Sequence, residues 1–285
     1  MNGSTATSNV TRKEPGATHA GMIGLGAMGL QMAKHMAAKG FQMSGYDIGT
    51  AQLAQAAEFG VKGLSSVAEV GKFSEIVVVM VQTDKQVEEV FFGGGLLDSL
   101  RPNSVVCISS SVSPVTCAKL AEAAAKKEIG VLDTPVVLGQ EAANNGTMTV
   151  FVGGEEKWVQ KAAPVLQTFG KHVIHLGPIG SGQIAKTANN LLLWSCIAAN
   201  FETLSFAKKM GADIPRLIDA LAYSSGANWS LSRWGKSTGK WAEKDMDVAL
   251  DLAQEAKVQM PLTALVDQLI KSMNQEKMRA LMTEP

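Results

Sequence analysis

Short apolar runs that favour β-strands alternate with helix-like segments from residue 20 to about residue 176 of the 285-residue chain. Examples of the β-type runs are AGMIGL at residues 20–25, EIVVVMV at 75–81 and SVVCIS at 104–109. Apolar residues fill these runs almost without interruption, which is typical of strands that helices cover on both faces of a sheet. With right-handed crossovers between the strands, the pattern predicts an α/β domain built on a parallel sheet.

The alternation ends at GPIGSG, residues 177–182, and almost everything after it has the periodicity of helices. A stretch from Ile184 to about Met210 is apolar on nearly all sides, so we expect one long helix that is buried between domains or subunits. Residues 1–18 are rich in Ser, Thr and Gly and lack hydrophobic periodicity. We therefore predict a disordered tail at 1–18, an α/β domain at 19–180, and an all-helical domain at 181–285 that the long helix joins to it.

Charge and hydropathy exclude several function classes. The chain has 26 Lys and Arg against 26 Asp and Glu, with no block of like charge, which argues against nucleic acids and anionic membranes as partners. No apolar run reaches the roughly 18 residues of a membrane span, and no apolar signal segment stands near the N-terminus. We expect a cytoplasmic protein that acts on a small molecule.

The cysteines and histidines lack the spacing of a metal site. Cys107, Cys117 and Cys196 lie far apart in apolar or helical surroundings, so we interpret them as reduced core thiols. His172 and His175 fall on opposite faces of a predicted strand. We predict no bound metal.

The segment GLGAMG at residues 24–29 lies between a predicted strand and a predicted helix. Gly24 would form the turn, Gly26 would let the backbone approach a pyrophosphate, and Gly29 would let the helix pack closely on the strand. The start of that helix would then face the phosphates, with Met28 as a further contact. In this context the spacing predicts a Rossmann domain that binds a dinucleotide.

The predicted second strand ends at Asp47, 18 residues after Gly29. A carboxylate at this place can accept hydrogen bonds from both ribose hydroxyls and would repel a 2′-phosphate. The following residues, IGTAQ, include no Arg that could bind that phosphate. These features predict NAD rather than NADP. The alternative is that Asp47 is only a turn residue before a helix.

Four further segments, read in order with the glycine turn, resemble the β-hydroxyacid dehydrogenase family, which includes 3-hydroxyisobutyrate dehydrogenase, tartronate semialdehyde reductase and 6-phosphogluconate dehydrogenase. The segments are ISSSVSP at 108–114, DTPVVLGQEAANNGTMTVFVGG at 133–154, GSGQIAKTANN at 180–190 and KDMDVAL at 244–250. The third, of the form GxGxxxKxxNN, is the most specific. The resemblance implies an NAD-dependent dehydrogenase or reductase that interconverts an alcohol and a carbonyl by hydride transfer.

The resemblance also implies that Lys186 is the general acid/base and that Asn190 helps to hold the substrate. The spacing agrees, because residues i and i+4 share one helix face, here at the junction where we expect a cleft between domains. Reduction of a carbonyl needs a proton donor at the developing alkoxide, and a Lys can serve if its pKa falls from about 10.4 toward neutrality. The alternative is a Lys that faces solvent near a helix start.

Further cofactor contacts that the resemblance implies are Val81, Gln82, Gln86, Ser111 and Lys244. The chain departs from the family at two of these places. It has Val81-Gln82 where Leu-Pro is usual, and Ser110-Ser111 where Ser-Thr is common. Contacts made by the backbone would survive both changes.

A third departure concerns the substrate. Members that act on small hydroxyacids carry Ser-Gly-Gly after the DxPV strand, where the Ser hydroxyl and nearby amides receive a carboxylate. This chain has Val137-Leu138-Gly139, whose apolar side chains cannot donate a hydrogen bond and would crowd a short acid. We expect a bulkier or more hydrophobic substrate, with Arg233 as the candidate for binding a distal acid group. The alternatives are that Val137 and Leu138 merely continue a buried strand and that Arg233 is a solvated or interface residue.

Arg233 lies among Trp229, Trp234 and Trp241, in a segment that the family places near the substrate. Clustered tryptophans are more often packing residues than ligand-binding ones. Two other functions stay open. An imine reductase shares this architecture, but it typically lacks the Lys and prefers NADP. A non-catalytic dinucleotide-binding scaffold would have no need for Lys186 and Asn190. The long apolar helix predicts a homodimer or homotetramer.

Overall fold

The computed structural model describes residues 18–236 and 242–283, so the predicted tail lies outside the described residues except for Thr18, and Trp241 lies outside them too. The chain divides into two compact units, Met1–Lys186 (unit 1) and Thr187–Pro285 (unit 2). None of the described helices combines the length and the apolar character that a membrane span requires.

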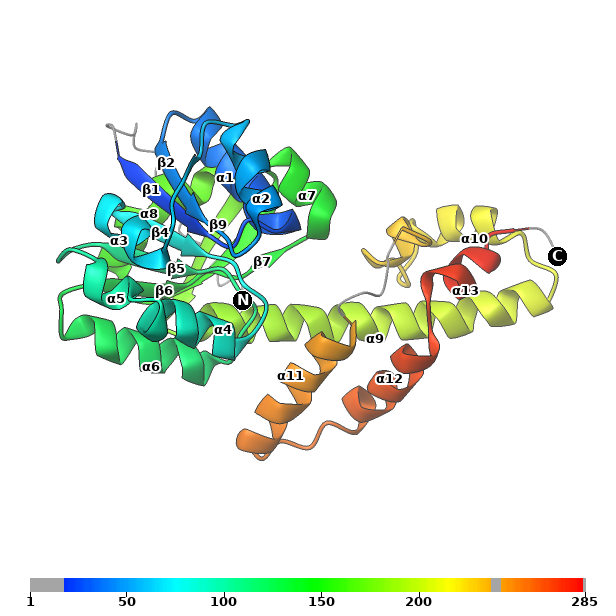
Figure 1. Ribbon diagram of the computed structural model, residues 1–285. Helices are drawn as coiled ribbons and strands as arrows, with labels where there is room; N and C mark the ends of the chain where they lie inside the picture. Colours follow the sequence, from blue (N-terminus) through cyan, green and yellow to red (C-terminus); the bar gives the residue numbers. More distant parts are fainter. Residues whose placement is uncertain (1–17, 237–241, 284–285) are drawn as a thin grey trace, which may run out of the picture. The chain divides into compact units, whose positions relative to one another are not determined.

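Unit 1 contains a nine-stranded sheet with the order β3-β2-β1-β4-β5-β6-β8-β7, and β9 pairs with β8 (Figure 1). The strands are β1 His19–Ile23, β2 Gln42–Tyr46, β3 Lys62–Gly63, β4 Ile76–Val79, β5 Val105–Ile108, β6 Gly130–Asp133, β7 Val136–Val137, β8 Met148–Gly153 and β9 Gly170–Gly177. Strands β1 to β6 are parallel, in the order typical of dinucleotide-binding sheets. The predicted Rossmann fold is therefore confirmed.

The far edge of the sheet departs from the parallel arrangement of β1 to β6. Strand β8 runs antiparallel to β6 and β7, and β9 runs parallel to β8. The apolar run GVLDTPVV, residues 130–137, forms two strands rather than one. Pro135 lies between them and has no N–H group to donate to a sheet partner.

Helices cover both faces of the sheet (Figure 1). They are α1 Ala27–Ala38, α2 Thr50–Ala57, α3 Val67–Phe73, α4 Asp84–Glu88, the π-helix η1 Glu89–Gly93, α5 Leu96–Ser99, α6 Pro114–Ala125, α7 Gly139–Asn145 and α8 Glu156–Phe169. Adjacent residues of a strand point to opposite faces. Val78 accordingly belongs to one core with Met32 of α1, while Val77 belongs to a second core with Leu120 of α6.

Helix α9 (Ser181–Lys209) begins in unit 1 and continues into unit 2. The other helices of unit 2 are α10 Ile214–Leu221, the 3-10 helix η2 Leu231–Arg233, α11 Ala242–Glu255, α12 Pro261–Ser272 and α13 Gln275–Ala280. They enclose a core of their own that includes Trp194 and Trp234. The indole N–H of Trp234 donates to the carbonyl oxygen of Met278 at 3.1 Å, so this Trp is a packing residue. The prediction of a helical C-terminal region is confirmed.

Candidate active site

The glycine turn after β1 meets the physical demands of a dinucleotide site. Gly24 has φ +90°, and a Cβ there would collide with the carbonyl oxygen of Met80. A Cβ at Gly29 would collide with the carbonyl oxygen of Gly24, so α1 packs closely on β1 only without a side chain. At Gly26 a Cβ would meet no atom within 4 Å, so the described chain itself does not require glycine there. A pyrophosphate at the start of α1, beside Met28, would account for it, and the turn fits that group.

Asp47 holds the glycine turn against the end of β2. Its Oδ2 accepts a hydrogen bond from the backbone N–H of Leu25 at 2.6 Å, and its Oδ1 accepts one from Gly49 at 2.8 Å. The carboxylate therefore acts as the turn residue that the alternative interpretation expected. Each oxygen has a second lone pair, so the same carboxylate can also accept from ribose hydroxyls.

The loop after β4 lies beside the glycine turn, because β4 pairs with β1, and the loop after β5 lies beside the loop after β4. The backbone N–H of Val81 donates to Oγ of Ser110 at 2.8 Å. That of Gln82 donates to Oε1 of Gln86 at 2.8 Å. Ser111 follows and is half-buried. These residues stand at the carboxyl ends of parallel strands, the edge at which such sheets bind ligands.

The segment Val137-Leu138-Gly139 divides between strand and turn. Val137 ends β7 and is buried, so it does continue the strand. Leu138 and Gly139 both have left-handed backbones, with φ +82° and +71°, and Leu138 is 39% exposed. A left-handed Leu costs roughly 1–2 kcal/mol. Nε2 of Gln140 donates to the carbonyl oxygen of Ala27 at 3.0 Å, which ties this turn to the start of α1.

Lys186 and Asn190 are one turn apart on α9 and share a helix face. Lys186 is half-buried and is the last residue of unit 1. Asn190 belongs to unit 2, is buried, and accepts a hydrogen bond at Oδ1 from Nδ2 of Asn189 at 3.1 Å. An ammonium and a carboxamide on one helix face can both donate hydrogen bonds to a substrate oxygen.

A buried carboxylate holds the start of α9. Oδ1 of Asp133 accepts from the backbone N–H of Gly180 at 2.7 Å, and Oδ2 accepts from that of Gln183 at 2.7 Å. Burial raises the pKa of the Asp133 carboxyl, and the N–H groups of Gly180 and Gln183 oppose this rise. Asp133 and Gln183 are absent from the site predicted above. Their only signal in the sequence is their place in the segments DTPVV and GSGQ.

Unit 2 carries the remaining predicted residues. The guanidinium of Arg233 lies over the ring of Trp229, 5.1 Å from its centroid, as a cation–π contact. Trp229 also lines a mostly apolar pocket of about 310 Å³ between α10 and residues 227–232. Lys244 is half-buried in the first turn of α11. Arg233 therefore has an aromatic partner within its own unit.

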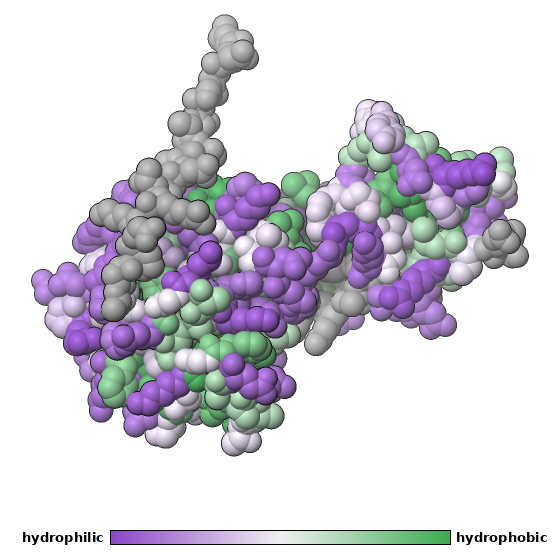
Figure 2. All heavy atoms as spheres, turned by 90° about the horizontal axis from the view of Figure 1, so that it is seen from above, coloured by the Kyte–Doolittle hydropathy of each residue, from purple (hydrophilic) through white to green (hydrophobic). Residues whose placement is uncertain are grey.

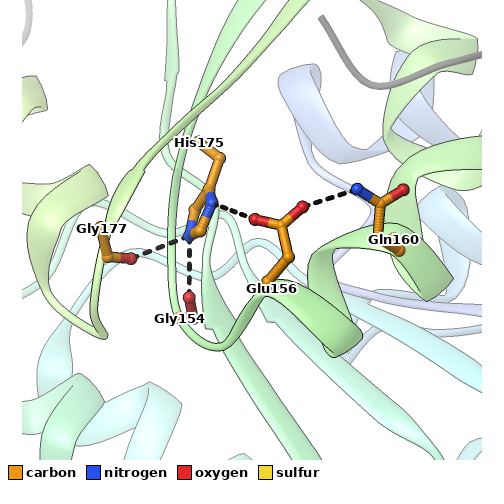
Figure 3. Close-up of polar contacts among 5 residues, drawn as sticks. All are labelled: Gly154, Glu156, Gln160, His175 and Gly177. Atoms are coloured by element: carbon orange, nitrogen blue, oxygen red, sulfur yellow. Dashed lines mark hydrogen bonds and ion pairs between the residues drawn. The ribbon is translucent and has the colours of Figure 1, made fainter. Parts of the chain in front are cut away.

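His175 serves the structure of unit 1 (Figure 3). Its Nδ1 lies 2.9 Å from Oε2 of Glu156, and its Nε2 lies 2.8 Å and 3.0 Å from the carbonyl oxygens of Gly154 and Gly177. All of these partners are oxygen atoms that accept hydrogen bonds. Nε2 of Gln160 donates to the other carboxylate oxygen of Glu156. The ring thus ties the start of α8 to the end of β9.

The cysteines differ in burial. Cys107 and Cys117 are buried, and burial raises the pKa of the Cys107 thiol to about 12, whereas Cys196 is only half-buried. Within residues 18–236 and 242–283, no three or more His, Cys, Asp or Glu side chains are grouped so that they could hold a metal ion.

Comparisons with known proteins agree with this geometry. A family model described as the NAD binding domain of 6-phosphogluconate dehydrogenase matches residues 19–177. A second, described as NAD-binding of NADP-dependent 3-hydroxyisobutyrate dehydrogenase, matches residues 180–281. The chain is 32% identical over 270 residues to 3-hydroxyisobutyrate dehydrogenase of Pseudomonas aeruginosa, covering 88% of this chain and 91% of that protein. It is also 32% identical over 263 residues to 2-(hydroxymethyl)glutarate dehydrogenase of Eubacterium barkeri, covering 88% and 87%.

Among solved structures, Mycobacterium tuberculosis 3-hydroxyisobutyrate dehydrogenase with L-serine has a TM-score of 0.85 to this chain. The match covers 93% of this chain and 99% of that one, at 24% identity, and it shows the shared fold. The chain therefore belongs to the β-hydroxyacid dehydrogenase family and is an oxidoreductase of the dehydrogenase type with a binding site for a nicotinamide dinucleotide.

Proposed function

We propose that this protein is an NAD-dependent dehydrogenase or reductase in which Lys186 is the general acid/base and Asn190 holds the substrate. One observation carries the proposal. The first turn of α9 is hydrogen-bonded to Asp133 at the carboxyl end of β6, and Lys186 lies on the next turn of that helix. This turn belongs to the same unit as the glycine turn and the loops after β4 and β5. The bound nicotinamide supplies or accepts the hydride.

Different residues of unit 1 would bind different parts of the dinucleotide. Gly24, Gly26, Met28 and Gly29 would hold the pyrophosphate at the start of α1, and Asp47 would accept hydrogen bonds from the ribose. Val81, Gln82, Gln86 and Ser111 would line the remaining edge. Asp47 also supports the choice of NAD, because its charge repels a 2′-phosphate.

Lys186 would exchange a proton with the substrate oxygen. In the direction of reduction, its ammonium donates a proton to the alkoxide that forms as the hydride arrives; in oxidation, the neutral amine removes that proton. The amide of Asn190, on the same helix face, would orient the oxygen.

We propose further that the substrate is bulkier or more hydrophobic than 3-hydroxyisobutyrate. Leu138 carries this proposal, since its side chain is exposed next to the turn that Gln140 ties to α1. Gly139 continues that turn, and buried Val137 supports it from within β7. Arg233, whose guanidinium lies over the ring of Trp229, is the proposed partner of a distal acid group on the substrate.

We also propose that the two domains, which meet at about residue 180, have different functions. Residues 19–180 bind NAD, and residues 181–285 serve substrate binding and assembly. Leu192 and Phe206 of α9 are 70% and 67% exposed, and Met210, which directly follows α9, is 72% exposed. Leu192 and Met210 are about five turns apart, with Phe206 one turn before Met210, so all three lie on one face. Exposed apolar side chains also appear among polar ones in Figure 2. We therefore propose a homodimer or homotetramer in which this face is buried.

The function is tested by measuring turnover of NAD and NADH with purified protein. The panel contains small hydroxyacids, aryl-substituted hydroxyacids, the matching aldehydes and cyclic imines. Turnover with an alcohol or carbonyl that depends on Lys186 supports the proposal. Turnover of cyclic imines alone would replace it with an imine reductase, and binding of the dinucleotide without any turnover would indicate a scaffold.

A further inference from the structure

Asp133 occupies an unusual place for a carboxylate, because it is buried at the end of β6. Its two oxygens accept the backbone N–H groups of Gly180 and Gln183, each at 2.7 Å. These N–H groups stand at the start of α9, where no helical carbonyl is available to accept them. A carboxylate suits this position, because the start of a helix carries partial positive charge and charge-assisted hydrogen bonds are strong.

Gln183 extends the same hydrogen bonding to the neighbouring loop. Its buried side chain donates from Nε2 to the carbonyl oxygen of Ser110 at 2.8 Å and accepts at Oε1 from the backbone N–H of Val112 at 3.3 Å. Oγ of Ser110 in turn accepts from the backbone N–H of Val81. Hydrogen bonds therefore connect the ends of β4, β5 and β6 to the start of α9, all within unit 1.

Lys186 depends on this connection through the helix itself. It follows Gln183 by three residues, a rise of about 4.5 Å along a helix. A shift of the first turn therefore shifts the point from which the Lys186 side chain extends. Misplacement of a reacting group by about 1 Å can cost roughly 10²-fold in rate.

We propose that Asp133 and Gln183 are positioning residues, which fix the start of α9, and with it Lys186, against the loops that follow β4 and β5. The inference rests on the proposed role of Lys186 as general acid/base. Neither residue needs to touch the substrate, because the protein itself already engages their polar side-chain atoms. Asp133 accepts from the backbone N–H groups of Gly180 and Gln183. The side chain of Gln183 is hydrogen-bonded to backbone groups of Ser110 and Val112.

The main variant is Asp133→Asn. It keeps the size of the side chain and one acceptor oxygen, but it places an NH₂ group against a backbone N–H. We expect kcat to fall about tenfold to hundredfold. The Kd of NADH, measured by fluorescence titration, should change less than about twofold, because the glycine turn is untouched.

A double-mutant cycle with Lys186→Ala separates positioning from general structural damage. If Asp133 acts through Lys186, Asp133→Asn has no further effect on the residual turnover of Lys186→Ala. Equal fold losses in both backgrounds overturn this inference and leave the proposed function standing. Unchanged turnover of Lys186→Ala alone overturns the proposed function, and the inference with it.

Two further variants keep the test decisive. Gln183→Met removes both side-chain contacts and leaves Asp133 in place, so it gives the same cycle if Asp133→Asn does not fold. Asp213→Asn is the matched control, because Oδ1 of Asp213 accepts the N–H of Arg216 at 3.1 Å at the start of α10. We expect it to leave kcat within about twofold in both backgrounds, since Asn caps a helix as well as Asp.

Discussion

The backbone N–H of Leu25 donates a 2.6 Å hydrogen bond to Oδ2 of Asp47, so the carboxylate proposed to select NAD also holds the glycine turn. Replacing Asp47 with Ala would therefore change two things at once. Asn removes the negative charge and keeps an acceptor for the N–H of Leu25, and its NH₂ group then faces the N–H of Gly49.

The first prediction is that the wild type prefers NAD(H) to NADP(H) and that Asp47→Asn narrows this preference. The expected change is about tenfold to hundredfold in the ratio of kcat/KM, because a charge repulsion of about 1–3 kcal/mol disappears. Steady-state kinetics with both cofactors measure it. Equal or better use of NADP(H) by the wild type would contradict the assignment of NAD.

The second prediction concerns proton transfer. Lys186→Ala should lower kcat by about 10²- to 10⁴-fold, because the alkoxide then lacks its proton donor. The Kd of NADH should change little, since Lys186 lies on α9 and not in the glycine turn. Turnover at the wild-type rate would mean that another group or water supplies the proton.

The third prediction concerns stability and pH. The hydrogen bond from Gln160 lowers the pKa of Glu156 from 4.5, burial opposes it, and His175 lowers it further. A carboxyl with a lowered pKa in the folded state stabilises the fold above its unfolded pKa, and this contribution is lost as pH falls through the folded value. Glu156→Gln should therefore cost more stability at pH 7 than at pH values well below the unfolded pKa of about 4.5. Urea unfolding over this range measures the difference, and a constant difference would exclude this role of Glu156.

Much of the fold follows from local sequence patterns. Strands β1, β4 and β5 fall within apolar runs, and the glycine spacing predicts the turn that the structure has between β1 and α1. Strand order at the far edge does not follow from such patterns. The antiparallel pairing of β8 depends on contacts between segments, not on its own residues. Pro135 could have signalled the division between β6 and β7, since a Pro inside a predicted strand argues against continuity.

The site shows the same limit. The spacing of Lys186 and Asn190 predicts that they share one helix face, and both lie on α9. The contacts of Asp133 do not follow from spacing, since its partners Gly180 and Gln183 are 47 and 50 residues away in the sequence. The sequence does not separate Val137 from Leu138, whereas the strand ends at Val137 and the chain turns at Leu138. Alternation along a strand predicts which residues are buried, but not the residue at which the strand ends.

The fourth prediction concerns assembly. If the exposed face of α9 forms the interface of a homodimer, Phe206→Glu should dissociate it, because a buried unpaired carboxylate in an interface costs several kcal/mol. Light scattering after size-exclusion chromatography gives the mass directly. Val115→Glu, an equally drastic change at an exposed residue of unit 1, is the control and should leave the mass unchanged. A wild type that is monomeric at micromolar concentration would rule out the interface.

The last prediction concerns substrate choice and rests on Leu138 alone, because Val137 is buried in β7. Leu138→Gly should raise kcat/KM for 3-hydroxyisobutyrate relative to an aryl-substituted analogue, since the short acid gains room and the ring loses an apolar wall worth about 25 cal/mol per Å². The same change should not destabilise the fold, because glycine relieves a left-handed backbone cost of roughly 1–2 kcal/mol. Val137→Ala is the companion variant: it should lower the free energy of unfolding by about 1–3 kcal/mol and leave the substrate preference as it was. If Leu138→Gly lowers stability and leaves the preference unchanged, Leu138 serves the turn and not the pocket, and the substrate is not selected at this place.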